Sequence, residues 1–333
     1  MPSFCRHNRL IQNCPICARE QDLELRPVVS PGGQATRSTT SSSVHPGRQG
    51  TPVRPRSAAG RTGPGLTVRR MVRGLDDGYH CQLIPGLRSS ADAARLAEEL
   101  AWATARLEQL TVAPPGLYAE LADPSIDIEE RSWLAFLIAF LGAAESVEPF
   151  AAIAAARTSW SSGHGPYLAE AIPGPRAALV LGQDNRTPDA YRAWAQRSGS
   201  QLAAFTGEAT WTPERRFARV FERLALPGFP RGARFELLTA LGRTGVYELR
   251  PGALAFGSID EVTLGAKRVL GIGDPLLLER RAAGLASACG VELEALDVGF
   301  YNWERGSRST LGMSAELEPD PAVLSAVQDT FGL

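Results

Sequence analysis

Apolar residues recur every three or four positions along most of the chain, which is the spacing of an amphipathic helix. In residues 89–110 that spacing relates Leu96, Leu100, Leu107 and Leu110, behind a serine- and aspartate-rich start that suits a helix N-terminus. Further helices are predicted at residues 126–144, 147–158, 188–199, 212–225, 233–243, 261–272, 275–290 and 292–304.

Only two stretches suggest extended structure. Residues 245–256, GVYELRPGALAF, predict a small β-hairpin. Residues 67–86 predict a short extended pair with a turn at Asp77 and Gly78. We therefore expect a mainly α fold with one small β-hairpin.

The first 66 residues lack this helical pattern. Residues 1–22 form a compact Cys/His cluster, and residues 23–66 are rich in Pro, Gly, Ser, Thr and Arg. Such a segment buries too little apolar surface to offset its ordering entropy, which predicts a disordered basic linker. The expected organisation is a zinc-knuckle-like motif at 1–22, the linker at 23–66 and a helical domain at 67–330.

Charge and composition argue against two properties: attraction of the whole chain to nucleic acid and insertion into a membrane. The net charge is −1, so no global field draws the chain to nucleic acid, and DNA contact requires a local patch. No run reaches the ~18 apolar residues of a membrane span, so we expect no membrane partner. The N-terminus lacks the apolar stretch of a signal peptide, which predicts a cytoplasmic, nucleoid-associated protein.

The N-terminal cluster FCRHNRLIQNCPIC has the spacing of a metal site. Cys14 and Cys17 form a C-P-x-C knuckle, and Cys5 and His7 supply a second pair of ligands. Zinc takes four such ligands in a tetrahedron, and a segment of this length needs metal for its folding energy. We expect a structural zinc ion that docks the motif on DNA, on a protein partner or on the helical domain.

Residues 259–274 contain the only lysine of the chain, Lys267, followed by the G-x-G pair Gly271 and Gly273. A Walker loop ends in Gly-Lys-Ser/Thr, whereas here the lysine precedes the glycines. A dinucleotide fingerprint needs a β-α-β unit, and the predicted neighbours are helices. The pattern therefore disfavours a nucleotide loop.

Residues 224–238, LALPGFPRGARFELL, predict two helices joined by a tight turn that contains Gly228 and Gly232. Glycines let a backbone approach a DNA phosphate, and the free amides of the second helix bind it. Asp260 follows the predicted β-hairpin and opens the next helix. This order resembles the helix-hairpin-helix DNA glycosylases, with their L-P-G-x-G-x-x-A hairpin and catalytic aspartate. The resemblance implies that Asp260 is catalytic.

Three features depart from the glycosylase pattern. The connection between the hairpin and Asp260 is longer, which leaves the alignment of this carboxylate in question. Arg231 and Arg234 stand near the position where lyase-type members carry a lysine, which argues against Schiff-base strand cleavage. The C-terminus has no four-cysteine cluster, so an iron–sulfur centre is not expected.

A second resemblance spans about residues 70 to 310. The stretches DIEERSWLAFLIAFL, GAKRVLGIGDPLLLERRAAGLA and ALDVGFYNWE are similar to the alpha-glutamyl/putrescinyl thymine pyrophosphorylase families. These are helical, glycosylase-related proteins assigned to DNA thymine hypermodification. The resemblance implies action on an activated 5-hydroxymethyluracil in DNA, where pyrophosphate leaves and an amine is installed.

Both resemblances imply a pocket that receives a base swung out of the duplex. Asp260 would stabilise a developing cation or take a proton from a nucleophile. Lys267, two helical turns farther on, would bind a leaving phosphate, and Asp297 is a third candidate catalytic residue. Tyr301 and Trp303 can stack on a base, and Asn302 can contact its edge.

The remaining predicted substrate or DNA contacts combine turn glycines, arginines and one helix-capping acid. They are Gly228, Arg231, Gly232, Arg234, Arg268, Gly271, Gly273, Asp274 and Arg280.

Structural explanations compete for several of these residues. Asp260 and Asp274 suit helix N-caps. Asp297 lies in an apolar helix, where a buried ion pair with Arg268 or Arg280 would explain it. The aromatic residues after Asp297 suit a core.

Three functions are consistent with the sequence. The favoured one is a DNA-binding protein that acts on a flipped modified pyrimidine, by thymine hypermodification or by base excision. The first alternative is a non-catalytic DNA-binding adaptor on a glycosylase-like fold. The second is an enzyme for a phosphate ligand unrelated to DNA.

Overall fold

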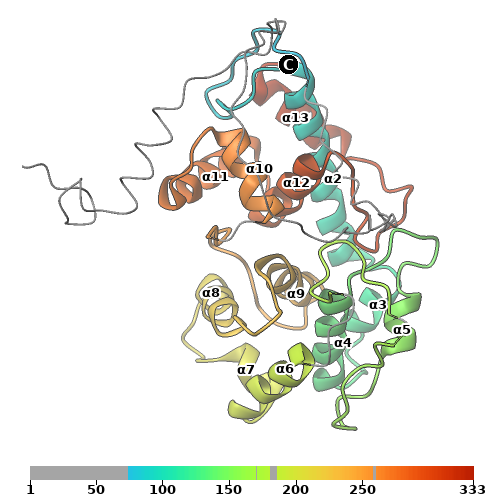
Figure 1. Cartoon of the computed structure of the whole chain (residues 1–333). Coiled ribbons are helices and arrows are strands. Elements are labelled where there is room, and N and C mark those ends of the chain that lie inside the picture. Colours follow the sequence, from blue (N-terminus) through green and yellow to red (C-terminus); the bar gives the residue numbers. More distant parts are fainter. Residues whose placement is uncertain (1–73, 170, 181–185, 258–259) are drawn as a thin grey trace, which may run out of the picture. The chain divides into compact units, whose positions relative to one another are not determined.

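The computed structural model describes residues 74–169, 171–180, 186–257 and 260–333. The chain divides into two units between Leu66 and Thr67, and every described residue belongs to the second. All regular elements of the described ranges are helices, which confirms the mainly α class (Figure 1). They are α2 (Ser90–Val112), α3 (Leu117–Ala122), α4 (Ile128–Leu141), α5 (Ala151–Ala156), α6 (Arg186–Arg197), α7 (Gln201–Thr206), α8 (Pro213–Arg223), α9 (Arg231–Arg243), α10 (Glu261–Leu270), α11 (Pro275–Cys289), α12 (Leu293–Arg305) and α13 (Pro321–Phe331).

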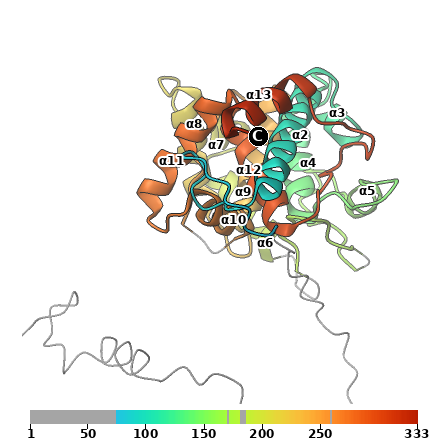
Figure 2. The ribbon, with the colours of Figure 1, turned by 90° about the horizontal axis from the view of Figure 1, so that it is seen from above.

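The helices form two groups. α2 packs against α12 and α13, and α10 and α11 complete this first group. α3 to α9 form the second group, arranged around α4 and drawn below the first in Figure 1. α2 also contacts α9, which joins the two groups, and Figure 2 looks down on α2 lying beside α12 and α13.

α4 is the centre of the second group because it is apolar on every side. Its residues from Ser132 to Leu141 are all buried. Its aromatic side chains continue into α6, where Tyr191 stacks on Phe136 with ring centroids 4.0 Å apart. Asp127 caps the exposed start of α4 by accepting a hydrogen bond from the Glu129 amide at 2.8 Å.

Glycines allow the helices of the first group to approach closely. A Cβ atom at Gly299 of α12 would lie 2.5 Å from Leu100 Cδ2 of α2. A Cβ atom at Gly265 of α10 would lie 2.6 Å from the carbonyl oxygen of Phe300 in α12. The predicted leucine face of α2 is confirmed, because Leu96, Leu100, Leu107 and Leu110 are all buried there.

The prediction of a β-hairpin at residues 245–256 is wrong, because the structure describes this whole segment and has no strand in it. Its backbone groups bond to other parts of the fold instead of across a hairpin. The Leu254 and Phe256 amides donate to the Glu279 carboxylate of α11 at 2.9 and 2.7 Å. The Arg250 amide donates to the Pro213 carbonyl at the start of α8.

The extended pair predicted at residues 67–86 is also wrong in its described part, since residues 74–86 contain no strand. The turn is present: Gly78 has a φ of +82°, and its amide donates to Asp76 Oδ1. The Asp77 carboxylate accepts from the Ser90 amide at the start of α2, which ties this segment to the helix. Among all the described residues, no helix combines the length and apolar character that a membrane crossing requires.

Candidate functional site

The predicted pair of helices is present, but its turn differs from the prediction. α8 and α9 are joined by residues 224–230, in which Gly228 is exposed and has a φ of +72°. Gly232 lies in the first turn of α9 and not in the connection. The N-cap residue, Pro230, makes no side-chain bond to the first amides of α9, which therefore have no partner within the helix.

Asp260 is the N-cap of α10 and also faces a cavity. Its Oδ1 accepts a hydrogen bond from the Thr263 amide at 2.8 Å. Its Oδ2 lies 3.8 Å from the Arg231 Nε, and the side chain is 19% exposed. Asp260 also lines a cavity of about 290 Å³. The same carboxylate therefore caps α10 and faces a space that could hold a ligand.

The cavity forms where three parts of the fold meet. The first turns of α9 and α10 line it, together with residues 173–179 and Tyr301 of α12. A helix N-terminus carries a partial positive charge, which favours a negatively charged group. At α10 the Asp260 carboxylate already fills this role, whereas the N-terminus of α9 has no side-chain cap. The volume lies near the lower end of the roughly 300–1,000 Å³ of small-molecule sites.

Arg176 extends from the segment that crosses the end of α4. The Ala178 and Leu179 amides donate to the Phe140 carbonyl at 2.9 and 2.8 Å, which fixes the path of this segment. Arg176 has a φ of +61°, a left-handed conformation that costs a residue with a Cβ on the order of 1 kcal/mol. Its side chain is only 3% exposed and lines the cavity.

A chain of buried charges supports Arg176 from behind. Its Nη2 pairs with Asp297 Oδ2 of α12, and its Nη1 lies 4.0 Å from Glu236 Oε2 of α9. Glu236 also pairs with Arg106 of α2, whose side chain is fully buried. Arg231 Nη1 lies 2.5 Å from Asp297 Oδ1. The network therefore joins the two helix groups beside the cavity.

The pKa shifts in this network follow from burial and opposite charges. Burial raises the pKa of the Asp297 carboxyl, but the charges of Arg176 and Arg231 outweigh it and leave that pKa below its ordinary value. Burial opposes the charge of Arg176, yet Asp297 and Glu236 raise its pKa above the ordinary value. The pairs therefore stay ionised at neutral pH.

Tyr301 provides the aromatic surface of the cavity. The Arg176 guanidinium lies over its ring at 4.9 Å from the centroid. The Arg305 Nη1 donates to its hydroxyl at 2.6 Å, which fixes the ring from the other end. Its side chain is almost fully buried, so any ligand reaches the ring only through the cavity.

The structure brings three predicted site residues to this cavity: Asp260, Gly232 and Tyr301. Asp297 lies behind it as an ion-pair partner, as the structural explanation proposed. The prediction that Asp297 pairs with Arg268 or Arg280 is wrong. Its carboxylate pairs with Arg176 and Arg231 instead. The sole lysine, Lys267, does not line the cavity.

The two arginines predicted to contact DNA are held by the protein. Arg231 is buried, pairs with Asp297 and donates to the Leu254 carbonyl. Arg234 lies over the Phe221 ring at 4.3 Å and donates to the Phe221 carbonyl at 3.0 Å. The prediction that they bind phosphate is therefore wrong for Arg231, which has no open surface, and unsupported for Arg234.

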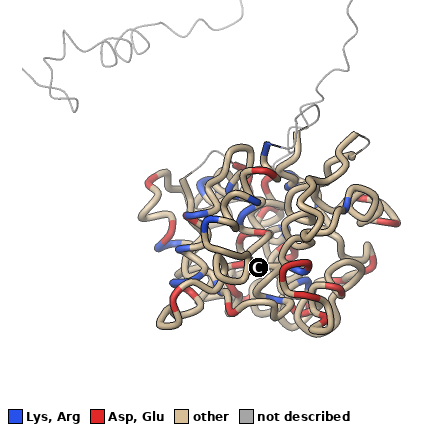
Figure 3. The backbone as a smooth tube through the Cα atoms, turned by 90° about the horizontal axis from the view of Figure 1, so that it is seen from below, with Lys and Arg blue, Asp and Glu red and all other residues tan. Residues whose placement is uncertain are grey.

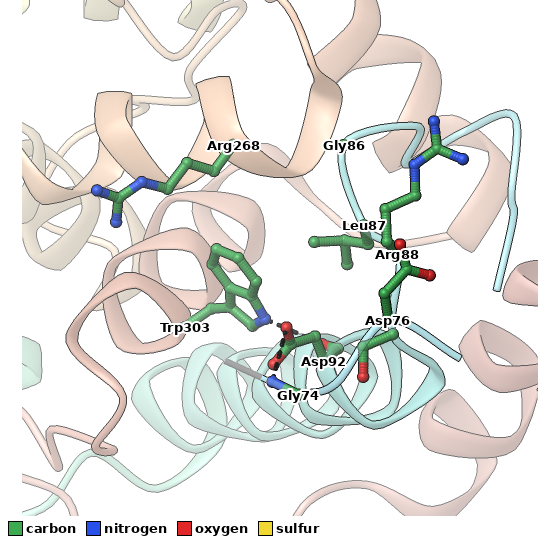
Figure 4. A pocket seen from close by; sticks show the side chains of 9 residues that line it. Gly74, Asp76, Gly86, Leu87, Arg88, Asp92, Arg268 and Trp303 are labelled. Carbon is green, nitrogen blue, oxygen red and sulfur yellow. Dashed lines mark hydrogen bonds between the residues drawn. The ribbon is translucent and has the colours of Figure 1, made fainter. Parts of the chain in front are cut away.

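Trp303 and Arg268 line a different, smaller cavity of about 170 Å³ (Figure 4). The indole Nε1 of Trp303 donates to the Asp92 carbonyl at 3.0 Å and fixes this buried ring against α2. Arg268 pairs with Glu304 of α12. The expectation that Trp303 stacks beside Asp260 is therefore wrong.

The other predicted contacts have structural roles or lie away from the cavity. Asn302 is buried and donates to Glu99 Oε2 at 3.0 Å. Gly271 ends α10 in a left-handed conformation. Asp274 caps α11 by accepting from the Leu277 amide at 3.0 Å. Gly273 and Arg280 are exposed and, like Gly228, do not line the cavity.

Sequence reasoning missed Arg176, Glu236 and Arg106. Each sits in an ordinary context: a Pro/Gly-rich segment for Arg176 and amphipathic helices for the other two. No spacing rule pairs residues 60 or 130 positions apart, so only the fold reveals that they meet. The sole usable signal was the G-P-R sequence at Gly174, typical of a tight turn.

Basic and acidic residues are interspersed over the face shown in Figure 3. The described ranges contain no cluster of His, Cys, Asp and Glu that could hold a metal ion. The predicted zinc ligands Cys5, His7, Cys14 and Cys17, and the linker at 23–66, lie outside the described residues.

Comparison with known proteins found no matching family model, no similar curated protein and no similar solved structure.

Proposed function

We propose that the helical domain binds DNA and acts on a modified pyrimidine that is swung out of the duplex into the cavity at Asp260. The observation that carries this proposal is that the Asp260 carboxylate, partly exposed, lines a cavity of about 290 Å³ beside Tyr301. A base must leave the stack before its atoms can react, so a base-directed protein needs such a recess.

Each group at the cavity has a chemical task in this proposal. Asp260 stabilises positive charge that develops on the sugar or the base, or takes a proton from an attacking nucleophile. Tyr301 forms part of the cavity wall against which the base lies. The exposed Gly228 has no side chain, and the first amides of α9 have no side-chain cap, so both approach the phosphates of the strand.

The resemblance to the thymine pyrophosphorylase families supports a specific version of this chemistry. There the oxygen–carbon bond of an activated 5-hydroxymethyluracil breaks, pyrophosphate leaves, and an amine nitrogen bonds to the same carbon while losing a proton. Asp260 is the acceptor of that proton. The glycosylase resemblance supports the other version, in which the bond between base and sugar breaks.

The N-terminal motif completes the proposal. Cys5, His7, Cys14 and Cys17 bind one structural zinc ion and dock the chain on DNA or on a protein partner. Their residue types and spacing support this assignment. The linker at 23–66 carries arginines and lacks acids over most of its length, so it adds non-specific attraction for phosphate in the nucleoid.

The test uses the full chain and a set of duplexes. One duplex carries thymine, one 5-hydroxymethyluracil and one its pyrophosphoryl ester, each with and without a polyamine as nucleophile. Nucleoside mass spectrometry is expected to show a modified or excised base with the wild-type chain and none with Asp260→Asn.

The matched control is Asp274→Asn, which weakens an N-cap of the same kind on α11, away from the cavity. This variant is expected to retain the activity, so a loss with Asp260→Asn alone would identify cavity chemistry and not cap loss. DNA affinity is expected to fall steeply with salt. Binding that ignores salt would contradict any contact with phosphate.

One observation favours a second function, the non-catalytic DNA-binding adaptor. Both oxygens of Asp260 are already engaged, Oδ1 by the Thr263 amide and Oδ2 by the nearby Arg231 guanidinium. Under this alternative Asp260→Asn leaves DNA affinity intact, and no duplex of the set is altered by the wild-type chain.

A further inference from the structure

The cavity at Asp260 contains a charged donor that the proposed base chemistry does not use. The Arg176 side chain is 97% buried, yet its Nε makes no hydrogen bond. A buried donor without an acceptor costs on the order of 1–3 kcal/mol. Arg176 also lines the cavity, so a ligand there can supply the missing acceptor. Its Nη2 is fixed by Asp297, which prevents the guanidinium from turning away.

Gly232 lies beside this edge of the guanidinium. It lines the cavity from the second position of α9, and a Cβ atom there would lie 3.7 Å from both Nε and Nη2 of Arg176. The α9 amides around Gly232 have no side-chain cap, since the N-cap is Pro230. The guanidinium edge, with its unbonded Nε, and the uncapped amides of α9 thus lie beside each other.

We propose that Arg176 and the first turn of α9 form an anion subsite that binds a phosphate group of the ligand. A phosphate oxygen accepts from Arg176 Nε and from the Gly232 amide, and the positive end of the α9 dipole adds to the attraction.

Two acidic residues, Asp260 and Glu261, also line the cavity. Arg231 lies 3.8 Å from Asp260 and offsets part of its charge, so the attraction for phosphate comes from Arg176 and α9 at close range. Asp297 acts as a positioning residue for Arg176.

The subsite deepens the proposed function, on which it rests for the identity of the ligand. The phosphate belongs either to a pyrophosphoryl leaving group or to the DNA strand. Binding of sodium pyrophosphate and of an unmodified duplex by the full chain distinguishes these sources, and both are measured by calorimetry without any reaction.

Gly232→Ala is the decisive variant because it fits the fold. Its methyl group meets Arg176 at an ordinary contact distance, and the glycine has no positive φ. Alanine also favours helix over glycine, so the melting temperature is expected to stay the same or rise. The matched control is Gly284→Ala on α11, where an added Cβ meets nothing within 4 Å.

The expected result is a loss of about tenfold or more in affinity for pyrophosphate, for the duplex or for both with Gly232→Ala, as for one lost charge-assisted hydrogen bond. Gly284→Ala is expected to bind as the wild type does. Equal affinity of wild type and Gly232→Ala for both probes would overturn the subsite. If affinity is equal but the base is still modified or excised, the subsite is wrong and the proposed function is retained. If pyrophosphate binds and depends on Gly232 but no base is altered, the subsite is supported and the proposed function is not.

Discussion

Asp297 is the buried carboxylate that pairs with both Arg176, which lines the cavity, and Arg231. Its two oxygens face Arg176 and Arg231, and its side chain is 1% exposed. Removing one partner of a buried pair leaves the other charges without compensation, which costs far more than the pair contributes. Asp297 is therefore a structural residue whose removal would leave Arg176 at the cavity without its carboxylate partner.

Asp297→Asn is predicted to lower the free energy of unfolding by about 3–5 kcal/mol, because two buried guanidinium groups lose their shared carboxylate. Urea denaturation at neutral pH measures this change. The control is Glu222→Gln, which breaks an exposed ion pair with Arg219 and is expected to cost less than about 1 kcal/mol. Equal costs for the two variants would contradict a buried network.

The same carboxylate predicts a pH dependence with a definite sign. The folded pKa of Asp297 is lowered, so its contribution to stability is complete above the unfolded pKa of about 3.9 and is lost as the pH falls through the folded pKa. Wild-type stability is therefore expected to fall below about pH 4 more steeply than that of Asp297→Asn. Urea midpoints between neutral and acid pH test this, and parallel curves would contradict it.

For single residues, the sequence predicts those roles that depend only on neighbouring positions in the chain. The capping positions of Asp260 and Asp274 follow from their place before a helix, and both are confirmed. The partners of Asp297 could not be predicted, because Arg176 and Arg231 approach it only through the tertiary fold. For the same reason Arg231 was assigned to DNA while the fold buries it.

Among the helices, the crossing of α10 and α12 depends on a close backbone approach. Gly265 permits it, since any Cβ there would lie 2.6 Å from the Phe300 carbonyl oxygen. This crossing also holds the first turn of α10, and with it Asp260, beside α12.

Gly265→Ala is predicted to destabilise the fold by roughly 1–3 kcal/mol, the usual cost of overpacking, despite the better helix propensity of alanine. Gly284→Ala, on the open face of α11, is predicted to stabilise it by up to about 1 kcal/mol. Thermal unfolding compares the two. Shifts of the same sign would show that α10 and α12 do not meet as described.

Helices were the elements best predicted from sequence, because apolar periodicity is a local property. The apolar run of α4 indicated a buried helix, and α4 is the centre of its group. The hairpin at residues 245–256 failed because alternation of side chains says nothing about where the backbone amides bond. Two of those amides bond to Glu279 of α11, a partner that the sequence pattern does not indicate.

For the whole molecule, zinc binding by the N-terminal motif is predicted to be independent of the folding of the helical unit. The full chain is predicted to contain one zinc ion, and Cys14→Ser is predicted to lose it. Because the chain divides between Leu66 and Thr67, removal of zinc by a chelator is expected to leave the main melting transition unchanged. Metal analysis beside calorimetry tests both statements, and full zinc content in Cys14→Ser would contradict the ligand set.

The two helix groups meet at the buried charges, and the cavity lies at that junction. α9 of the second group carries Glu236 and Arg231, and α12 of the first carries Asp297 and Tyr301. This arrangement explains why the site could be predicted only in part: Asp260, Gly232 and Tyr301 were candidates, but Arg176 completes the cavity from a separate segment.

The most direct test of the central claim is amide hydrogen exchange of the full chain with and without a duplex that carries an extrahelical 5-hydroxymethyluracil. Ligand binding in the cavity predicts slower exchange at residues 173–179, 230–233 and 260–262, the segments that contain most of its lining residues. Protection confined to other parts of the helical domain, with these three segments unchanged, would contradict the claim that the cavity at Asp260 is the functional site.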